Sequence, residues 1–246
     1  MQLSDSCNAA GFSANSDDVF GRIAARYGLL CDLFSLGIHR RWKRRVAEVI
    51  ARESWNELLD VACGTGDIVS RVLSHGTRHT QHIVACDLSP QMLGVAERRL
   101  SKQRHPVELR CLDANSLSDV ASNSVDLYSI SLGLKICERR AVVREAMRVL
   151  RPGGRLVVLE ASNIPVSWIQ SAYLRYMSAC MPVVGWIATG GDASAYRYLL
   201  QGIREFPTAE QLADELREIG FQDVNFERLS FGIVAIHVAR KPTQSG

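Results

Sequence analysis

The chain has 246 residues, of which 47% are hydrophobic and 22% are charged, and its formal net charge is +3. This length and hydrophobic content are sufficient for one domain with a sizeable core. The weak positive charge argues against a dedicated nucleic-acid-binding protein, which is usually far more basic. The seven cysteines are odd in number and show no Cys-x-x-Cys spacing, so we expect reduced cysteines in a cytoplasmic protein.

The sequence predicts neither a secretory signal nor a membrane span. Residues 1–17 are polar and lack a basic start followed by an apolar core, and we expect them to form a disordered tail. The most apolar later stretch, residues 164–188, is interrupted by Pro165, Arg175 and Pro182. It therefore falls short of the roughly 20 consecutive apolar residues that span a bilayer.

Residues 18–55 are predicted to form N-terminal helices that precede the main sheet. Within them, apolar side chains recur at helical spacing and form one stripe, made by Ile38, Trp42, Val46, Val49 and Ile50. The rest of this helix surface is basic, with Arg40, Arg41, Lys43, Arg44 and Arg45. Two interpretations stay open: a solvated basic face, or a surface that attracts an anionic membrane or substrate.

The segment from Glu57 to Ile68 is the most informative part of the sequence. A short apolar strand leads into a turn that contains Gly64 and Gly66, and a helix follows. Glycines at these two positions allow a ligand to approach the backbone closely. The dinucleotide-binding fingerprint would need a third glycine where Val69 stands, and a P-loop would need a Gly-Lys-Ser/Thr sequence. Both phosphate-binding motifs are therefore disfavoured.

Acidic residues flank this turn and follow it in the sequence. Asp60 and Asp67 stand at its two ends, an arrangement that suits a cationic or zwitterionic ligand better than a pyrophosphate. The next predicted strand, residues 82–87, ends at Asp87, about 20 residues after the turn. At that distance, α/β nucleotide-binding units place the carboxylate that binds ribose hydroxyls.

Predicted strands alternate with predicted helices along the chain. This pattern is typical of an α/β protein with a doubly wound, mostly parallel, seven-stranded Rossmann-like sheet. The strands are expected at residues 57–61, 82–87, 107–112, 125–131, 155–160, 221–228 and 232–240, the last two forming an antiparallel edge. The carboxyl ends of parallel strands meet at one edge of a sheet, where such proteins bind ligands. Asp113 and Ser131, at the ends of the third and fourth strands, should therefore join Asp87 there.

A long insertion, residues 161–206, follows the fifth predicted strand. It is rich in apolar and aromatic residues such as Trp168 and Tyr176, whereas an ordinary connection has about 4–6 residues. We expect a helical lid or a wall of the substrate site; packing helices without ligand contact are the alternative. After the insertion, Thr208 and Gln211 match a capping box that starts a further helix.

The glycine turn and the acids at the strand ends resemble those of class I S-adenosylmethionine-dependent methyltransferases. The alternative is an acid-lined turn in another doubly wound fold. The resemblance implies S-adenosylmethionine as the cofactor. The predicted cofactor-binding residues lie in the turn or near the strand ends: Asp60, Gly64, Thr65, Gly66, Asp87, Leu88, Met92, Asp113, Ala114 and Ser131.

Further motifs narrow this resemblance. They are Ala25-Arg26-Tyr27, Gly37-Ile38-His39-Arg40 with Trp42-Lys43, Arg148-Val149-Leu150-Arg151-Pro152-Gly153-Gly154-Arg155, Tyr196-Arg197-Tyr198-Leu199 and Gly232-Ile233-Val234-Ala235-Ile236-His237. With the glycine turn, these motifs make the chain similar to the ubiquinone/menaquinone C-methyltransferase family between about residues 18 and 241. We therefore expect a single methyltransferase domain over residues 18–241.

The resemblance implies methyl transfer from S-adenosylmethionine to a ring carbon of a polyprenylated quinol, either demethylmenaquinol or a ubiquinone precursor. The family usually has Gly-Leu-Arg-Asn after the fourth strand, whereas this chain has Gly133-Leu134-Lys135-Ile136. Lysine lacks the planar fork of arginine, and isoleucine forms no hydrogen bond. Two alternatives therefore stay open: a methyltransferase of the same fold that acts on another lipid or secondary metabolite, and a non-catalytic assembly subunit that binds S-adenosylmethionine.

A ring carbon becomes a good nucleophile when the neighbouring phenol loses its proton, so the site needs a base or a cation near that oxygen. We predict that Tyr27 and His39 handle the proton and that Lys135 stabilises the oxyanion. No metal is required, and the histidines at 75, 79 and 82 lack supporting ligands.

The expected partner is a small lipophilic substrate rather than a nucleic acid. Peripheral contact with the inner face of a membrane and formation of a homodimer are further expectations.

Overall fold

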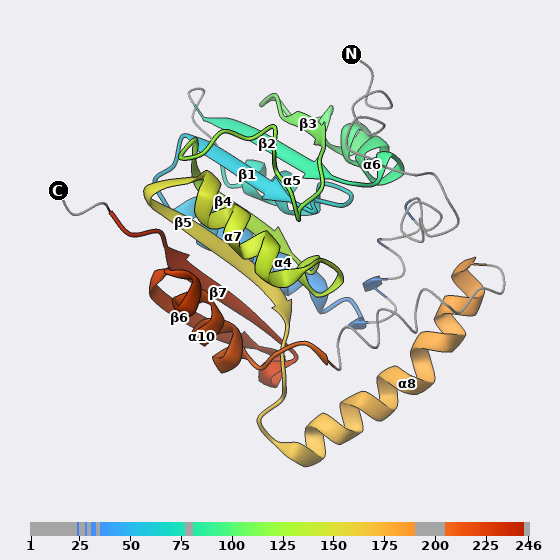
Figure 1. Cartoon of the computed structure of the whole chain (residues 1–246). Helices are drawn as coiled ribbons and strands as arrows, with labels where there is room; N and C mark the ends of the chain where they lie inside the picture. The colour runs from blue at the N-terminus through green and yellow to red at the C-terminus, as the bar shows by residue number, and fades with distance from the viewer. Residues whose placement is uncertain are drawn as a thin grey trace.

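The computed structural model describes residues 24, 28, 31–32, 35–76, 81–189 and 205–243, with the backbone alone for residues 181–189. Its centre is a seven-stranded sheet of order β3-β2-β1-β4-β5-β7-β6 (Figure 1). The strands are β1 (Glu57–Val61), β2 (His82–Asp87), β3 (Glu108–Cys111), β4 (Val125–Ser131), β5 (Leu150–Ala161), β6 (Gln222–Leu229) and β7 (Val234–Arg240). β1 to β5 pair in parallel, while β7 is antiparallel to β5 and β6. The predicted doubly wound sheet with an antiparallel edge is confirmed.

Helices cover both faces of this sheet. α4 (His39–Arg52), α5 (Asp67–Ser74) and α6 (Pro90–Leu100) lie on one face, and α7 (Arg139–Val149) and α10 (Ala209–Ile219) lie on the other (Figure 1). Successive strand residues point to opposite faces. Leu58 of β1 accordingly packs with α4 and α5, whereas Leu59 packs with α7 and α10. Two apolar cores therefore hold the strand ends in fixed positions.

Local capping determines where the helices begin. The Ser89 hydroxyl accepts a hydrogen bond from the Met92 amide at 3.4 Å, and Pro90 occupies the first helical position of α6. At α10, Thr208 and Gln211 form the predicted capping box, with each side chain bonded to the other residue's amide. The capping box at the start of α10 agrees with the sequence-based prediction.

Strand β5 is longer than predicted. Its expected start was residue 155, but the strand begins at Leu150 and includes the Pro152-Gly153-Gly154 turn. The reason is that the turn is bonded into the sheet: the Gly153 amide donates to the Lys241 carbonyl, and the Lys241 amide donates to the Gly154 carbonyl. A register shift opposite β4 accommodates the extra residues.

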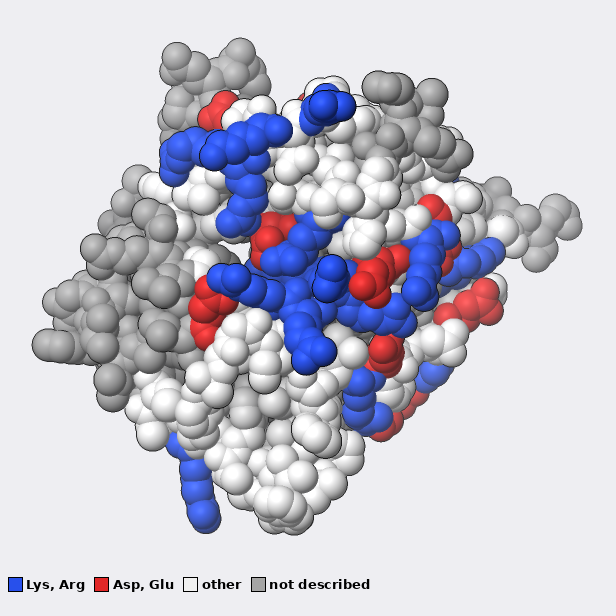
Figure 2. Space-filling model, turned by 180° about the vertical axis from the view of Figure 1, so that it is seen from behind, with Lys and Arg blue, Asp and Glu red and all other residues white. Residues whose placement is uncertain are grey.

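The basic surface of α4 differs from the prediction at one residue. Arg40, Arg41 and Arg44 are exposed, but Lys43 is only 8% exposed. Lys43 follows His39 by one turn and precedes Ala47 by another, so it lies on the buried side of the helix. Seen from behind the view of Figure 1, lysine and arginine side chains gather near the centre of the face (Figure 2).

Within the insertion, α8 (Ser167–Thr189) runs away from the edge of the sheet (Figure 1). No helix in the described ranges is long and apolar enough to cross a membrane. The predicted tail at residues 1–17 and the Tyr196-Arg197-Tyr198-Leu199 motif lie outside the described residues. The lid function of the insertion stays a prediction.

The cysteines only partly agree with the prediction. Cys31, Cys63, Cys86, Cys137 and Cys180 are free thiols. Cys111 is disulfide-bonded, so the prediction of reduced cysteines is wrong at this residue. Sequence spacing does not report the tertiary proximity on which disulfide pairing depends.

Candidate active site

The glycine turn and the acid of the next strand meet at the carboxyl edge of the sheet. β1 and β2 are adjacent and parallel, and Val61 pairs with Cys86. The Gly64 amide donates a hydrogen bond to Asp87 Oδ2 at 2.8 Å, and the Ser89 amide donates to Asp87 Oδ1 at 2.9 Å. The sequence motifs at 64 and 87 therefore lie together at one edge of the sheet rather than on two separate surfaces.

The two glycines of the turn have different roles. Both have a positive φ, 54° for Gly64 and 70° for Gly66, which side chains rarely adopt. A Cβ at Gly64 would meet nothing within 4 Å, so this position faces open space. A Cβ at Gly66 would lie 3.0 Å from Leu100 Cδ1 and 3.2 Å from Ala96 Cβ. Gly64 thus leaves room for a ligand, whereas Gly66 allows α6 to pack against the turn.

A narrow hollow of about 30 Å³ lies beside this turn. It is lined by residues of α4, β1, α5, the glycine turn and the end of β4: Lys43, Asp60, Ala62, Cys63, Gly64, Thr65, Asp67, Ile68, Ser131 and Leu132. By the volume that a buried water needs, a space of this size holds about two water-sized polar groups. The rest of a larger ligand would have to extend outward along the strand ends.

The Asp60 carboxyl lines the hollow, and only one of its two oxygens is hydrogen-bonded in the described structure. Its side chain is buried, and Oδ1 accepts a hydrogen bond from Ser129 Oγ at 2.5 Å. Among the described residues, Oδ2 has no hydrogen-bond partner. The pKa of Asp60 is raised to about 7, chiefly by burial and also by the Asp87 charge, while the hydrogen bond from Ser129 and the Lys43 charge oppose the shift. A cationic ligand group would satisfy the free oxygen and favour the ionised carboxyl.

Asp67, the other acid of the turn, is already matched by cations. Lys43 Nζ lies 3.0 Å from Oδ2, Arg71 Nε lies 3.0 Å from Oδ1, and Arg99 Nη1 lies 3.8 Å from Oδ1. Burial would raise the pKa of Asp67, but these neighbours lower it below its ordinary value. Protein cations therefore already neutralise Asp67. The expectation that Asp60 and Asp67 together suit a cationic or zwitterionic ligand stays a prediction.

The other predicted cofactor-binding residues lie along the same edge or just behind it. Ser131 Oγ is buried without a hydrogen-bond partner in the described structure. Asp113 Oδ1 accepts hydrogen bonds from the amide and the side chain of Asn115, at 2.8 and 2.9 Å. Leu88, beside Asp87, is an exposed hydrophobic residue. Together with the glycine turn at the end of β1, these groups offer polar and apolar contacts over four adjacent strand ends.

Three of the predicted residues are less accessible. Met92 lies on the buried side of α6, and Ala114 is buried as well. The Thr65 hydroxyl and carbonyl both accept hydrogen bonds from Arg99 Nη1, at 2.9 Å each. Arg99 was not predicted, and nothing in its spacing from the turn signals this contact.

Of the predicted catalytic residues, Tyr27 lies outside the described residues, and His39 is buried at the start of α4. The His39 Nδ1 atom lies 2.9 Å from Ser35 Oγ. Burial, with the nearby charge of Lys43, lowers the pKa of His39 to about 4. The imidazole is therefore uncharged at neutral pH, one helical turn from a residue that lines the hollow.

Lys135 is neither exposed nor unpaired. Its ammonium lies 3.0 Å from Glu160 Oε1 and donates to the Leu132 carbonyl. The side chains of Lys135 and Glu160 are 8% and 1% exposed. The Lys135 amide also donates to Glu160 Oε2 at 3.1 Å. Sequence reasoning missed Glu160, because nothing in a strand sequence shows which buried acid a distant lysine will meet.

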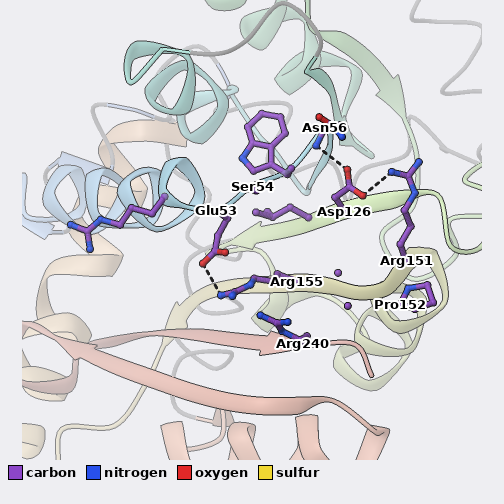
Figure 3. A pocket seen from close by; sticks show the side chains of 13 residues that line it. Glu53, Ser54, Asn56, Asp126, Arg151, Pro152, Arg155 and Arg240 are labelled. Carbon is purple, nitrogen blue, oxygen red and sulfur yellow. Dashed lines mark hydrogen bonds and ion pairs between the residues drawn. The ribbon is translucent and has the colours of Figure 1, made fainter. Parts of the chain in front are cut away.

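A larger cavity, of about 670 Å³, lies at the opposite edge of the sheet, where β1 and β4 begin (Figure 3). Arg151 pairs there with Asp126 at 2.7 Å, and Arg155 pairs with Glu53 at 2.6 Å (Figure 3). This cavity is far larger than the hollow at the glycine turn, but none of the predicted site residues line it. We therefore assign the candidate site to the carboxyl edge.

Three features define a class I methyltransferase. They are the strand order, the antiparallel β7, and the glycine turn followed by an acid at the end of β2. The fold agrees with that of solved structures. An S-adenosylmethionine-dependent methyltransferase of Thermotoga maritima superposes with a TM-score of 0.62 at 15% identity, covering 90% of this chain and 97% of that chain.

The chain belongs to the ubiE/COQ5 methyltransferase family, whose model matches residues 10–241. A similar relative is the ubiquinone/menaquinone biosynthesis C-methyltransferase UbiE of Paracoccus denitrificans, 40% identical over 89% of this chain and 87% of the relative. Another is the mitochondrial 2-methoxy-6-polyprenyl-1,4-benzoquinol methylase of Caenorhabditis elegans, 37% identical over 91% of this chain and 79% of the relative. Family and fold together imply the use of S-adenosylmethionine.

The Lys135–Glu160 pair leads to a stability prediction. Replacing Lys135 with Met leaves a buried carboxylate without its cation, so we expect the free energy of unfolding to fall by about 3–5 kcal/mol. Urea denaturation measures this loss. The double variant K135M/E160M should recover part of it, because neither charge is then left alone. Lys102→Met, at an exposed lysine, is the control. A loss below about 1 kcal/mol in K135M would contradict a structural ion pair.

Asp60 leads to a prediction about pH. Its folded-state pKa of about 7 lies above the roughly 3.9 of an unfolded aspartate, so the folded state holds the proton more tightly. Relative to Asp60→Asn, the wild type without ligand should therefore lose stability as pH rises from about 4 to 7, by at most about 1.4 kcal/mol per pH unit. Above pH 7 the difference should stay constant.

Urea unfolding at a series of pH values tests this dependence on Asp60. Asp119→Asn, at an exposed acid, serves as the control. Stability curves of the wild type and Asp60→Asn that run parallel from pH 5 to 8 would refute a raised pKa at this residue.

Proposed function

We propose that this chain transfers the methyl group of S-adenosylmethionine to a ring carbon of a polyprenylated quinol in quinone biosynthesis. The observation that carries the proposal is a crevice, the hollow lined by Gly64 and Asp60, beside which the Gly64 amide bonds to Asp87. In the described structure, Asp60 Oδ2 in this crevice has no hydrogen-bond partner. The acceptor class is supported by the names of the relatives, which describe quinone and benzoquinol methylation.

The residues of the crevice fit the chemistry of this cofactor. The free Oδ2 of Asp60 would bond to its ammonium group, and Asp87 at the end of β2 would hold the ribose hydroxyls. Leu88 is an exposed hydrophobic beside Asp87 and would contact the adenine, with Asp113 further along the edge. Gly64 lacks a side chain that could obstruct this path.

When bound, S-adenosylmethionine supplies an electrophilic methyl group on a sulfonium cation. The chain must hold the acceptor in line and limit access of water, because charge is lost as the cation meets a phenolate. His39 is uncharged at neutral pH, so it would accept the phenol proton and, because its pKa is low, pass that proton on to water. The Lys135 ammonium has three donors, of which Glu160 and Leu132 take two. The third would bond to the oxyanion.

Peripheral contact with an anionic membrane belongs to the same proposal. Its support is the exposed arginines Arg40, Arg41 and Arg44 of α4, which would interact with anionic headgroups. Trp168 and Phe231 are 71% and 83% exposed, and aromatic side chains of this kind can enter the headgroup layer of a membrane. A lipophilic acceptor would be most concentrated at such a surface.

Cofactor binding gives a first test. Asp87→Asn removes the charge but keeps an acceptor oxygen, so we expect the affinity for S-adenosylhomocysteine to fall about tenfold or more. Calorimetry measures this, and the exposed Asp223→Asn is the control. If the wild type does not bind S-adenosylhomocysteine, all the methyltransferase functions fail together. If Asp87→Asn binds as tightly as the wild type, the assignment of Asp87 to the ribose is refuted.

Product analysis tests the acceptor. The purified chain is incubated with methyl-labelled S-adenosylmethionine and either demethylmenaquinol or a demethylated benzoquinol, and we expect the label on a ring carbon. Label on an oxygen, or turnover only with another lipid, would support a different methyltransferase of the same fold. Binding of S-adenosylhomocysteine without turnover of any acceptor would favour a non-catalytic subunit.

A further inference from the structure

We propose that Lys43 binds the carboxylate of the amino-acid end of S-adenosylmethionine and so selects ligands that carry this group. The inference rests on the proposed function, because it assumes that the cofactor lies in the crevice at Gly64. It adds a residue of the N-terminal helix α4 to a site that is otherwise formed by the glycine turn and the strand ends.

The position of Lys43 is unusual for a lysine on a basic helix. It is 8% exposed, although its neighbours Arg41 and Arg44 are exposed. Its side chain reaches from α4 to the hollow that Asp60 and Gly64 also line. Lysine is rarely buried unless a partner compensates its charge. In the described structure its ammonium has a single ion-pair partner, Asp67, at 3.0 Å.

The charges around Asp67 do not balance. Lys43, Arg71 and Arg99 bring three positive charges to within 4 Å of one carboxylate. Asp67 therefore leaves a local surplus of positive charge beside the first turn of α5, whose N-terminal amides also favour an anion. Arg99 uses one nitrogen to bond to Thr65 as well. A second carboxylate in the hollow would offset this surplus.

The same hollow also carries a group that can become negative. Asp60 has a buried oxygen without a partner in the described structure, and both Asp60 and Lys43 line the hollow. The Lys43 charge also lowers the pKa of Asp60. An amino-acid end carries an ammonium and a carboxylate on one carbon, so it matches an acid and a lysine that line one small cavity. We assign the ammonium to Asp60 and the carboxylate to Lys43.

The test compares two ligands that differ only in the carboxylate: S-adenosylhomocysteine and S-adenosyl-3-thiopropylamine, which keeps the amine. Calorimetry should show that the wild type prefers S-adenosylhomocysteine by about ten- to hundredfold. Lys43→Met should weaken S-adenosylhomocysteine by a similar factor and leave the amine ligand within about twofold, so that the preference disappears. Lys43→Arg, which keeps the charge, should retain most of the preference. Arg44→Met, at the exposed neighbour, should change neither affinity.

Different outcomes test the role of Lys43 and the proposed function. Equal loss for both ligands in Lys43→Met would show that the residue only supports the fold through Asp67, and it would overturn the inference. Unchanged affinities in that variant would overturn it too. If Lys43→Met does not fold, Lys43→Gln takes its place, with circular dichroism as the check. A wild type that binds neither ligand would refute the proposed function itself.

Discussion

The hydrogen bond from the Gly64 amide to the Asp87 carboxylate is the interaction on which the candidate site depends. It holds the turn after β1 against the end of β2, and a second bond, from the Cys63 amide to the Cys86 carbonyl, continues the pairing past the last strand residue. The turn can adopt this path because Gly64 tolerates a positive φ. The Asp87 carboxylate is thereby held beside the open space at Gly64, where a ligand can also bond to it.

Buried charge is concentrated at this edge of the sheet. Asp60 keeps an unbonded oxygen, Lys43 reaches into the hollow, and the Lys135–Glu160 pair lies nearby at the ends of β4 and β5. Removing charges from water is costly unless they are well paired. The Lys135–Glu160 pair satisfies this condition within the protein. Asp60 does not, which is the physical reason to expect a ligand with a positive group there.

The fold could be predicted from the sequence because its signals are local. Apolar runs such as residues 125–131 indicate strands buried on both faces, and caps such as Ser89 and Thr208 mark helix starts. The residues of the site could be predicted only where they directly follow the ends of strands. Lys43 was grouped with the basic surface of the helix, although the positions 39, 43, 46 and 50 already describe one side of a helix. The partners of Asp67 and Lys135 depend on packing between elements, which no local pattern reports.

Cavity size alone would have identified the wrong edge. The larger cavity, at the start of β1 and β4, has arginines whose charges are met by protein acids, as in the pairs Arg151–Asp126 and Arg155–Glu53. The smaller hollow holds a carboxylate oxygen and a serine hydroxyl that the described structure leaves unbonded. A protein tolerates such groups mainly where binding satisfies them. Because unsatisfied polar groups are available to bind a ligand, the smaller hollow is the better candidate for the active site.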